Sequence, residues 1–527
     1  MFSPARPLVR LLPVLLLLAT LGSRSWSGDD QPQGAAAAPP AAAILSWNDL
    51  GKHCMDPDFA VFTILPPFNT INSQLMINGK LQQVAAGFTV EYDGVPDASG
   101  SINTTSIGKT SFWDHVLALF GVSLPVDTGL AGHNMPGPAN TPQPVSFEET
   151  WDWFHAEGIP ITPTDDALAQ NSYPLLRFTA KDFLGNVLDQ TSNTAPVSTE
   201  LECSLCHSSA ASPDAMPASG WVFDPNVLRD DRLNILKLHD QLQANDPLFA
   251  SSLASAGYDS AGLLATANGG TSILCASCHL SNALPGTGLP GISSLTSALH
   301  SRHADVFTPD GDTLNNEGTR ASCFTCHPGN KTQCLRGAMG AAVAADGQLA
   351  IECQSFHGDM NAVGDPAQVG WLEEPDCQSC HTGTATNNSG AIRFASVFDE
   401  NGVVHSAADP LFATTDDVPS NGFNLYRFST GHGGLQCAAC HGSPHAIYPS
   451  SEPNDNVQSE QFQGHAGTVV ECESCHGGQP ETNFGTKNWF AGANVPCFVC
   501  HQGPFSEDES QNAKPSPNRQ ARRRPTI

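Results

Sequence analysis

The pentapeptide Cys-x-x-Cys-His occurs seven times between residues 203 and 501, and it restricts this 527-residue chain more than any other feature of the sequence. Histidine makes up only 19 of the 527 residues. A histidine after each of seven Cys-x-x-Cys pairs would arise by chance with odds of about 10⁻¹⁰. The motifs are Cys203/Cys206/His207, Cys275/Cys278/His279, Cys323/Cys326/His327, Cys377/Cys380/His381, Cys437/Cys440/His441, Cys472/Cys475/His476 and Cys497/Cys500/His501.

This motif has the spacing by which proteins attach c-type haem. Two cysteines three positions apart can each form a thioether to one of the two vinyl groups on a haem edge, and the adjacent histidine then binds the iron as an axial ligand. Structural zinc sites and disulfides also use closely spaced cysteines, but neither needs a histidine after every second cysteine. The motifs therefore predict seven covalent haems.

Residues 353–357 read as a further motif in which Phe356 stands where the second cysteine is expected. This segment either holds an eighth haem through one thioether, with His357 on the iron, or has lost its haem and leaves Cys353 for a disulfide. Cys54 and Cys334 also lie outside the seven motifs. They are the remaining pair if Cys353 binds haem, whereas otherwise Cys334 is the closest partner of Cys353. The sequence does not decide between these pairings.

At these motifs the chain resembles the multihaem c-type cytochromes, over about 300 residues ending at His501. The resemblance implies closely packed haems that replace much of a hydrophobic core and exchange electrons rapidly. Residues 51–56 and 327–353 also resemble segments of a subgroup of large bacterial multihaem proteins.

The second axial ligand of each iron has to come from elsewhere in the chain. Twelve histidines lie outside the seven motifs, and the whole chain has only seven methionines, so we expect His/His ligation and low reduction potentials for most haems. His445 follows His441 by four residues, a placement that the resemblance associates with a neighbouring haem. His115 and His155 lie among aromatic residues and are expected to bind no metal. The candidate distal ligands are His239, His300, His303, His405, His432, His445 and His465.

The chain before the motifs has the patterning of strands. Asn78-Gly79 and Gly185-Asn186 are hairpin signals, and they predict paired strands before and after each dipeptide, from 74 to 92 and from 175 to 197. We interpret residues 45–200 as a β-rich, sandwich-like domain.

Two helices are predicted from their starting residues. Ser146 and Glu149 form a capping box ahead of a short helix. Asp224, followed by Pro225, predicts the start of a longer helix that reaches His239.

The rest of the chain divides by composition. Arg6 and Arg10 precede an apolar run that is too short to span a bilayer, so residues 1–27 are predicted to be a signal peptide. Residues 28–44 form a low-complexity linker, and residues 506–527 form a disordered tail. Residues 201–505 are expected to be a multihaem cytochrome c domain with short helices and little regular structure. The fold class is thus α+β and loop-rich.

The net charge of −29 disfavours nucleic acid and anionic membranes as partners. We therefore expect an exported protein, periplasmic or extracellular, that passes electrons through its haems to redox proteins or an extracellular acceptor. The alternative is a multihaem oxidoreductase acting on a small inorganic nitrogen or sulfur compound at one open haem. Electron transfer is favoured because all seven intact motifs end in histidine, and no catalytic residue is assigned.

Overall fold

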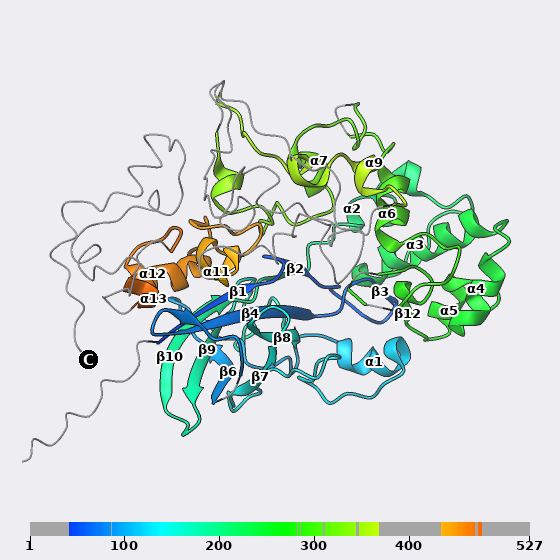
Figure 1. Ribbon diagram of the computed structural model, residues 1–527. Coiled ribbons are helices and arrows are strands. Elements are labelled where there is room, and N and C mark those ends of the chain that lie inside the picture. Colours follow the sequence, from blue (N-terminus) through cyan, green and yellow to red (C-terminus); the bar gives the residue numbers. More distant parts are fainter. Residues whose placement is uncertain are drawn as a thin grey trace, which may run out of the picture. The chain divides into compact units, whose positions relative to one another are not determined.

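The largest element of the fold is a single antiparallel sheet (Figure 1) in the strand order β1-β4-β8-β7-β6-β9-β10, with β5 added to β4. The computed structural model describes residues 42–85, 87–281, 283–284, 286–308, 311–343, 347–367, 434–469 and 473–476. The strands of the sheet are β1 Ala42–Asn48, β4 Phe68–Ile77, β5 Lys80–Leu81, β6 Phe88–Val95, β7 Gln143–Glu148, β8 Trp153–Pro160, β9 Leu175–Asp182 and β10 Val187–Thr194. β1 begins inside the stretch that composition assigns to the linker.

The sheet curls until its two ends meet. The backbone N–H of Ile44 in β1 donates to the carboxylate of Asp189 in β10 at 2.9 Å. The β-rich character is confirmed, but the sandwich is wrong, because one nearly closed sheet encloses the core instead of two stacked sheets. Strands that twist in one direction bring the edges of a long antiparallel sheet together in this way.

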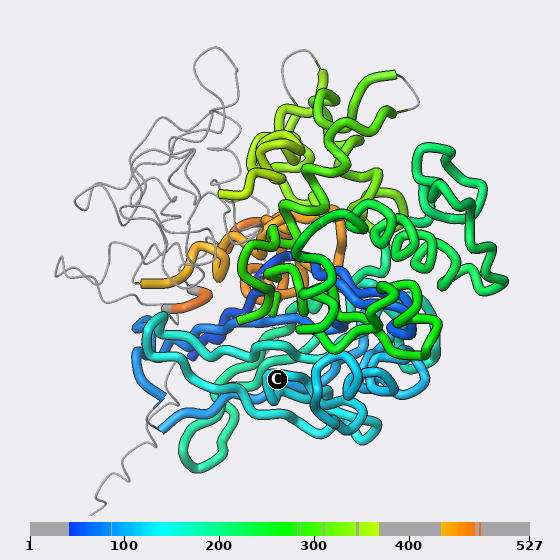
Figure 2. Tube along the Cα trace, turned by 90° about the vertical axis from the view of Figure 1, so that its right-hand side faces the viewer, coloured from blue at the N-terminus to red at the C-terminus, as the bar shows by residue number. Residues whose placement is uncertain are grey.

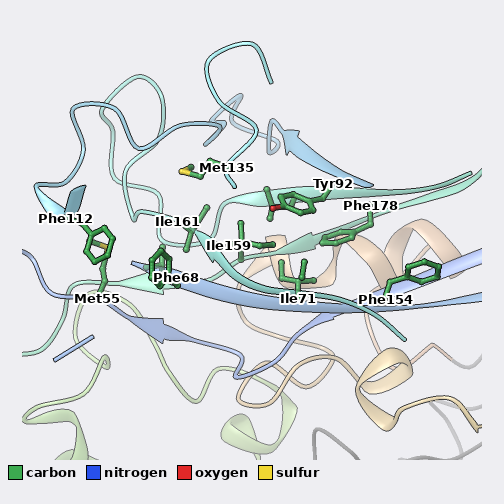
Figure 3. Packing of buried hydrophobic residues seen from close by; sticks show 14 of the residues in the cluster. Met55, Phe68, Ile71, Tyr92, Phe112, Met135, Phe154, Ile159, Ile161 and Phe178 are labelled. Atoms are coloured by element: carbon green, nitrogen blue, oxygen red, sulfur yellow. The ribbon is translucent and has the colours of Figure 1, made fainter. Parts of the chain in front are cut away.

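The core of the sheet is aromatic and aliphatic. Tyr92 of β6 and Phe178 of β9 lie with their rings 5.8 Å apart between the strands, and Ile71 and Ile159 pack beside them (Figure 3). All four side chains are fully buried. Burying each contributes about 1.5–3 kcal/mol. The Tyr92 hydroxyl donates to the carbonyl of Asn134 at 2.6 Å, so its one polar group is satisfied.

Both predicted hairpins are present. Asn78 and Gly79 have φ values of 53° and 71°, the two positive angles that a two-residue type I′ turn requires, and they join β4 to β5. The strand after this turn ends at Leu81 instead of continuing into β6. The second hairpin joins β9 to β10 through a longer loop, in which the carboxylate of Asp182 accepts the N–H groups of Leu184 and Asn186.

The predicted helix after Ser146 is wrong. Ser146 lies in β7, and the chain turns back after Glu148 into β8. Phe147 and Phe154 sit opposite each other in the two strands with their rings 5.0 Å apart. Such cross-strand aromatic pairs stabilise strands, and here they outweigh the local capping signal.

The helix that carries His239 begins slightly later than predicted. Asn226, not Asp224, is the N-cap of α3 Val227–Gln243, and its side chain accepts the N–H of Leu228 at 3.0 Å. Asp224 instead accepts the N–H of Asn226. Leu233 and Leu236 of α3 pack on Phe62, so this helix is anchored to the N-terminal part of the chain.

Two short parallel ladders join the N-terminal part to the first motifs. They pair β2 His53–Cys54 with β11 Val197–Ser198, and β3 Phe62–Thr63 with β12 Ile273–Leu274. The Cys275 motif follows β12 directly. The position of that motif is therefore fixed by a strand rather than by a free loop.

Apart from α3, the described helices after residue 200 are short (Figure 1). Among the described residues, no helix has the length and apolar character needed to cross a bilayer. Residues 1–27, the tail at 506–527 and most of the linker lie outside the described residues. The remaining helices are α1 Phe112–Phe120, α2 Ser204–His207, α4 Phe249–Ala256, α5 Leu263–Asn268, α6 Leu295–His303, α7 Arg320–Phe324, α8 Gln354–His357, α9 Met360–Val363, α11 Cys437–His441, α12 Val457–Gln463 and α13 Glu473–His476, with 3-10 turns at Pro213–Ala215, Cys275–Ser277, Ala338–Ala341 and Pro453–Asn456.

Candidate functional site: four facing histidine pairs

Five motif segments lie within the described residues up to their histidines. The fifth, Cys437–His441, forms α11, and each of the other four is named by its first cysteine: the Cys203, Cys275, Cys323 and Cys353 sites. In each of them the backbone makes one tight turn, in which the N–H of the histidine donates to the carbonyl of the first cysteine. These N–O distances are 2.9 Å for His207, 3.0 Å for His279, 2.8 Å for His327 and 3.0 Å for His357. The turn places the first cysteine and the histidine on one side, as shared binding of one haem requires.

The second cysteine of each intact site belongs to the same turn. The N–H groups of Cys206 and Cys278 donate to the carbonyls of Cys203 and Cys275, both at 3.2 Å, and all four thiols are free and half-buried. The Cys206 thiol also lies near a cysteine outside its own motif. Burial and, after it, the electrostatic effect of Cys206 raise the pKa of Cys326 to about 11. The sequence pairs Cys206 with Cys203 alone, so this second neighbour was not expected. The thioether assigned to Cys206 stays a prediction.

The histidine of each site faces a second histidine from a distant part of the chain. All four partners belong to the predicted distal set. The ring centroids are 6.2 Å apart in His207–His303, 6.4 Å in His239–His279, 6.1 Å in His300–His327 and 6.2 Å in His357–His445.

One helix supplies two of these partners. His300 and His303 lie three residues apart on α6, and therefore on neighbouring positions of one helix face. Their Nδ1 atoms donate to the carbonyls one turn back, on Thr296 and Leu299, at 2.8 Å and 2.7 Å. These bonds fix both rings and leave Nε2 as the nitrogen that faces the motif histidine. A second-sphere carbonyl on Nδ1 is typical of metal-binding histidines.

α3 supplies the third partner. His239 lies one turn beyond Leu236, which anchors the helix, and its ring contacts Phe249 at a centroid distance of 5.7 Å. Opposite it, Nδ1 of His279 donates to the carbonyl of Ser293 at 2.9 Å. Nδ1 atoms of His207 and His239 are buried without a hydrogen-bond partner, which is costly for a polar group and is expected where another group completes the site.

Burial favours the neutral form of several of these imidazoles. Burial and, after it, the neighbouring histidine of each pair together lower the pKa of His207, His239 and His327 to about 4. Burial also lowers the pKa of His300. Neutral imidazole is the form that binds metal, so the rings are ready to act as ligands at neutral pH.

The spacing within the pairs fits an iron held between two rings. A metal–imidazole nitrogen bond is about 2 Å long, and the nitrogen lies about 1 Å from the ring centre, so two imidazoles on opposite sides of one metal have centroids roughly 6 Å apart. Among the described residues, no three His, Cys, Asp or Glu side chains converge as a metal site. Two protein ligands suffice only where the metal brings its other ligands with it, as haem iron does.

The four sites are neighbours. α6 links the Cys203 and Cys323 sites through its two histidines, and the N–H of Glu202 donates to the carbonyl of Cys326 at 3.4 Å. The thiols of Cys323 and Cys353 hydrogen-bond each other, which joins the Cys323 and Cys353 sites. α2 packs on α3, which carries the partner of the Cys275 site. A continuous series therefore runs from the Cys275 site through the Cys203 and Cys323 sites to the Cys353 site.

Buried charges surround His445. The N–H groups of Arg336 and Gly337 donate to its carbonyl, and the Arg336 guanidinium forms a buried ion pair with Asp455. Nζ of Lys52 is buried without a hydrogen-bond partner, 4.1 Å from the centre of the Tyr173 ring. Burial lowers the pKa of Lys52 to about 8.

Other predicted residues make further contacts. Nδ1 of His441 lies 3.5 Å from Oγ1 of Thr468, and Nδ1 of His465 donates to the carbonyl of Ala466. His115 contacts Ser272, and His155 contacts Asn72.

The remaining cysteines fall into three groups. Cys54 and Cys334 have free thiols, so neither of the disulfides considered for them is formed in this structure. Cys437 and Cys440 lie on α11, and Cys475 lies on α13. The side chain of His476 and the residues Cys377, Cys380, His381, His405, His432, Cys472, Cys497, Cys500 and His501 lie outside the described part of the chain.

Sequence reasoning found the histidines but missed which ones face each other. It also missed the groups that hold His445, namely the Leu50 carbonyl and the Arg336 backbone. The segments 51–56 and 327–353, which the resemblance singled out, could have pointed to these groups. The first begins one residue after Leu50, and the second contains Arg336. Comparisons with protein-family models, curated proteins and solved structures give no match for this chain.

Proposed function

We propose that the chain is a multihaem c-type cytochrome that transfers electrons outside the cytoplasm. The observation that carries the proposal is the set of three intact motifs whose histidines each face a second histidine at a ring-centroid distance of 6.1–6.4 Å. Haem bound at these sites would supply one-electron chemistry. The chain's own part would be to hold each iron between two imidazoles.

The arrangement of the sites supports transfer between them. His300 and His303 sit on one helix, so the irons of the Cys323 and Cys203 sites would be separated by little more than the side chains of that helix. The thiol contact between Cys323 and Cys353 brings the next site equally close. Sites this near to each other pass electrons without moving parts, which suits a conduit.

The alternative function, an oxidoreductase for a small nitrogen or sulfur compound, needs an iron with only one protein ligand. None of the four facing pairs provides such an iron, and the Cys353 site, where the altered motif would have suggested one, has His445 opposite His357. The observations on the described residues therefore favour electron transfer.

The test uses the purified, exported full-length protein. We expect a covalent haem content that persists in denaturant, and a ferric spectrum at the facing pairs that is low-spin and unmoved by cyanide, nitrite or sulfite. His239→Ala, His300→Ala and His303→Ala should each open one haem to cyanide. His133→Ala is the matched control, because its ring bonds to the carbonyl of Glu157 and lies far from any motif in sequence. A colourless protein, or cyanide binding equal in all four variants and the wild type, would contradict the proposal.

A further inference from the structure

The segment with Phe356 in place of the second cysteine keeps the geometry of an intact site. We propose that Cys353 and His357 bind an eighth haem through a single thioether, with His445 as the sixth ligand of its iron. The inference rests on the proposed function for the presence of haem, and it adds a site that the intact motif alone does not assign.

The backbone at this site matches that of the intact motifs. Cys353 has φ −56° and ψ −40°, and Cys203 has φ −55° and ψ −33°. The N–H of Phe356 donates to the carbonyl of Cys353 at 3.1 Å, as the N–H of Cys326 does to Cys323 at 3.1 Å. A segment released from haem binding would have no need to keep this turn.

The histidine pair matches as well. The rings of His357 and His445 lie 6.2 Å apart with their planes 27° from parallel, which falls within the spacing of the three intact pairs. Two imidazoles at this spacing leave room for one metal ion between them.

His445 is held in place more firmly than a packing residue needs to be. Its φ of 62° is uncommon for a residue with a side chain, and such strain persists only where the surroundings enforce it. Here its carbonyl accepts two N–H groups, from Arg336 and Gly337, both at 2.8 Å. Nδ1 donates to the carbonyl of Leu50 at 2.9 Å, which turns Nε2 toward His357.

The attachment chemistry needs no oxidant. The thiol of Cys353 adds across one vinyl group: a sulfur–carbon bond forms at one vinyl carbon, and the thiol proton ends on the other. Phe356 has no thiol, so the second vinyl group stays unreacted. The rival fate of Cys353 is a disulfide with Cys334 or with the hydrogen-bonded Cys323, and the latter would remove a thioether from an intact site.

The experiment counts covalent haems by intact mass under denaturing conditions in the exported full-length protein. We expect eight in the wild type and in Cys334→Ser, and seven in Cys353→Ser. Phe356→Cys should keep eight and shift the pyridine haemochrome band toward that of doubly attached haem, because it consumes the last vinyl group. His445→Ala should keep eight and gain one cyanide-binding haem.

Peptide mapping of the wild type keeps the test decisive if a variant does not fold. A haem on the peptide that contains Cys353 supports the inference. Seven haems in the wild type, or Cys353 recovered in a disulfide, would overturn it while leaving the proposed function intact. A wild type without any covalent haem would instead overturn the proposed function.

Discussion

The curled sheet and the segment from residue 295 to residue 367 are built in opposite ways. The sheet encloses a dense core of aromatic and aliphatic side chains. Among the described residues from 295 to 367, yellow-green in Figure 2, the buried apolar side chains are only Ala304, Leu314, Pro328, Leu335 and Ile351. The other side chains buried there are Ser297, Ser322 and Arg336, and the histidines of the facing pairs stay partly accessible to solvent. The difference indicates that the sheet has a hydrophobic core of its own. The segment has too few apolar side chains for such a core, and haem would supply the missing apolar surface.

The largest expected effect is the loss of stable structure in this segment when haem is not attached. Protein made without the haem-attachment machinery should keep slow amide exchange in β4, β8 and β9 and should lose protection in α6, α7 and α8 by roughly 100-fold or more. The physical reason is that those helices have too little apolar surface to bury among themselves. Hydrogen exchange of haem-free and haem-loaded protein measures it. Equal protection of both regions would break the comparison.

Removing a side chain from the core of the sheet should destabilise the sheet without affecting haem binding. Phe178→Ala removes a fully buried ring and should lower the free energy of unfolding by about 3–5 kcal/mol, as measured by urea titration. Its haem content per folded chain should not change. The matched control is Phe183→Ala, whose ring is 79% exposed and should cost almost nothing. Similar losses in both variants would show that the sheet lacks the proposed core.

Gly51 follows β1 and lies against the segment that carries His445, so it should be sensitive to one added methyl group. Its φ is +73°, and an added Cβ would lie 1.4 Å from the carbonyl oxygen of Pro444, the residue before His445. Gly51→Ala should therefore cost about 2–3 kcal/mol and open one haem to cyanide, because the Leu50 carbonyl would shift.

Gly121→Ala separates strain from contact in that test. Gly121 has a similar φ of +69° but open space around an added Cβ, so the variant should cost about 1 kcal/mol and leave the haem spectrum unchanged. If both variants behave alike, the close approach of the two segments is wrong.

The smallest expected effect is a pH dependence from Lys52. Its pKa is about 8 in the folded protein and 10.5 for an exposed lysine, so between these values the unfolded chain binds more protons than the folded one. The free energy of unfolding should thus rise from pH 8 to pH 10.5, by on the order of 1–3 kcal/mol. Below pH 8 both states are protonated, and the contribution is constant. Urea titrations of the wild type and Lys52→Met should show the rise only in the wild type; an equal rise in both contradicts it.

The sequence predicted the β-rich N-terminal part, both hairpins and the histidines that form the facing pairs. Prediction from the sequence failed where contacts between residues far apart in the chain determine the structure. The capping signal at Ser146 lost to the pairing of Phe147 with Phe154 across two strands. The start of α3 moved because Asn226 caps it and Asp224 serves the turn before it.

The pairing of the histidines could not be predicted for a similar reason. His207 and His303 are brought together by helices that are far apart along the chain, and no local pattern encodes that contact. The same holds for the approach of Cys206 to Cys326, which belong to different motifs. The closeness of His300 and His303 in the sequence even suggests a shared site, whereas their positions on α6 direct them to two different ones.

Electron paramagnetic resonance of the ferric full-length protein tests the central claim most directly. The ring planes are 80° and 89° apart in His207–His303 and His239–His279, but 14° and 27° apart in His300–His327 and His357–His445. Nearly perpendicular imidazoles leave two iron d orbitals almost equal in energy and give a highly anisotropic low-spin signal. Nearly parallel imidazoles split those orbitals and give a rhombic one. We predict both signals, with His303→Ala weakening the first and His300→Ala the second; a spectrum without low-spin haem, or one that neither substitution changes, would contradict the facing pairs as iron ligands.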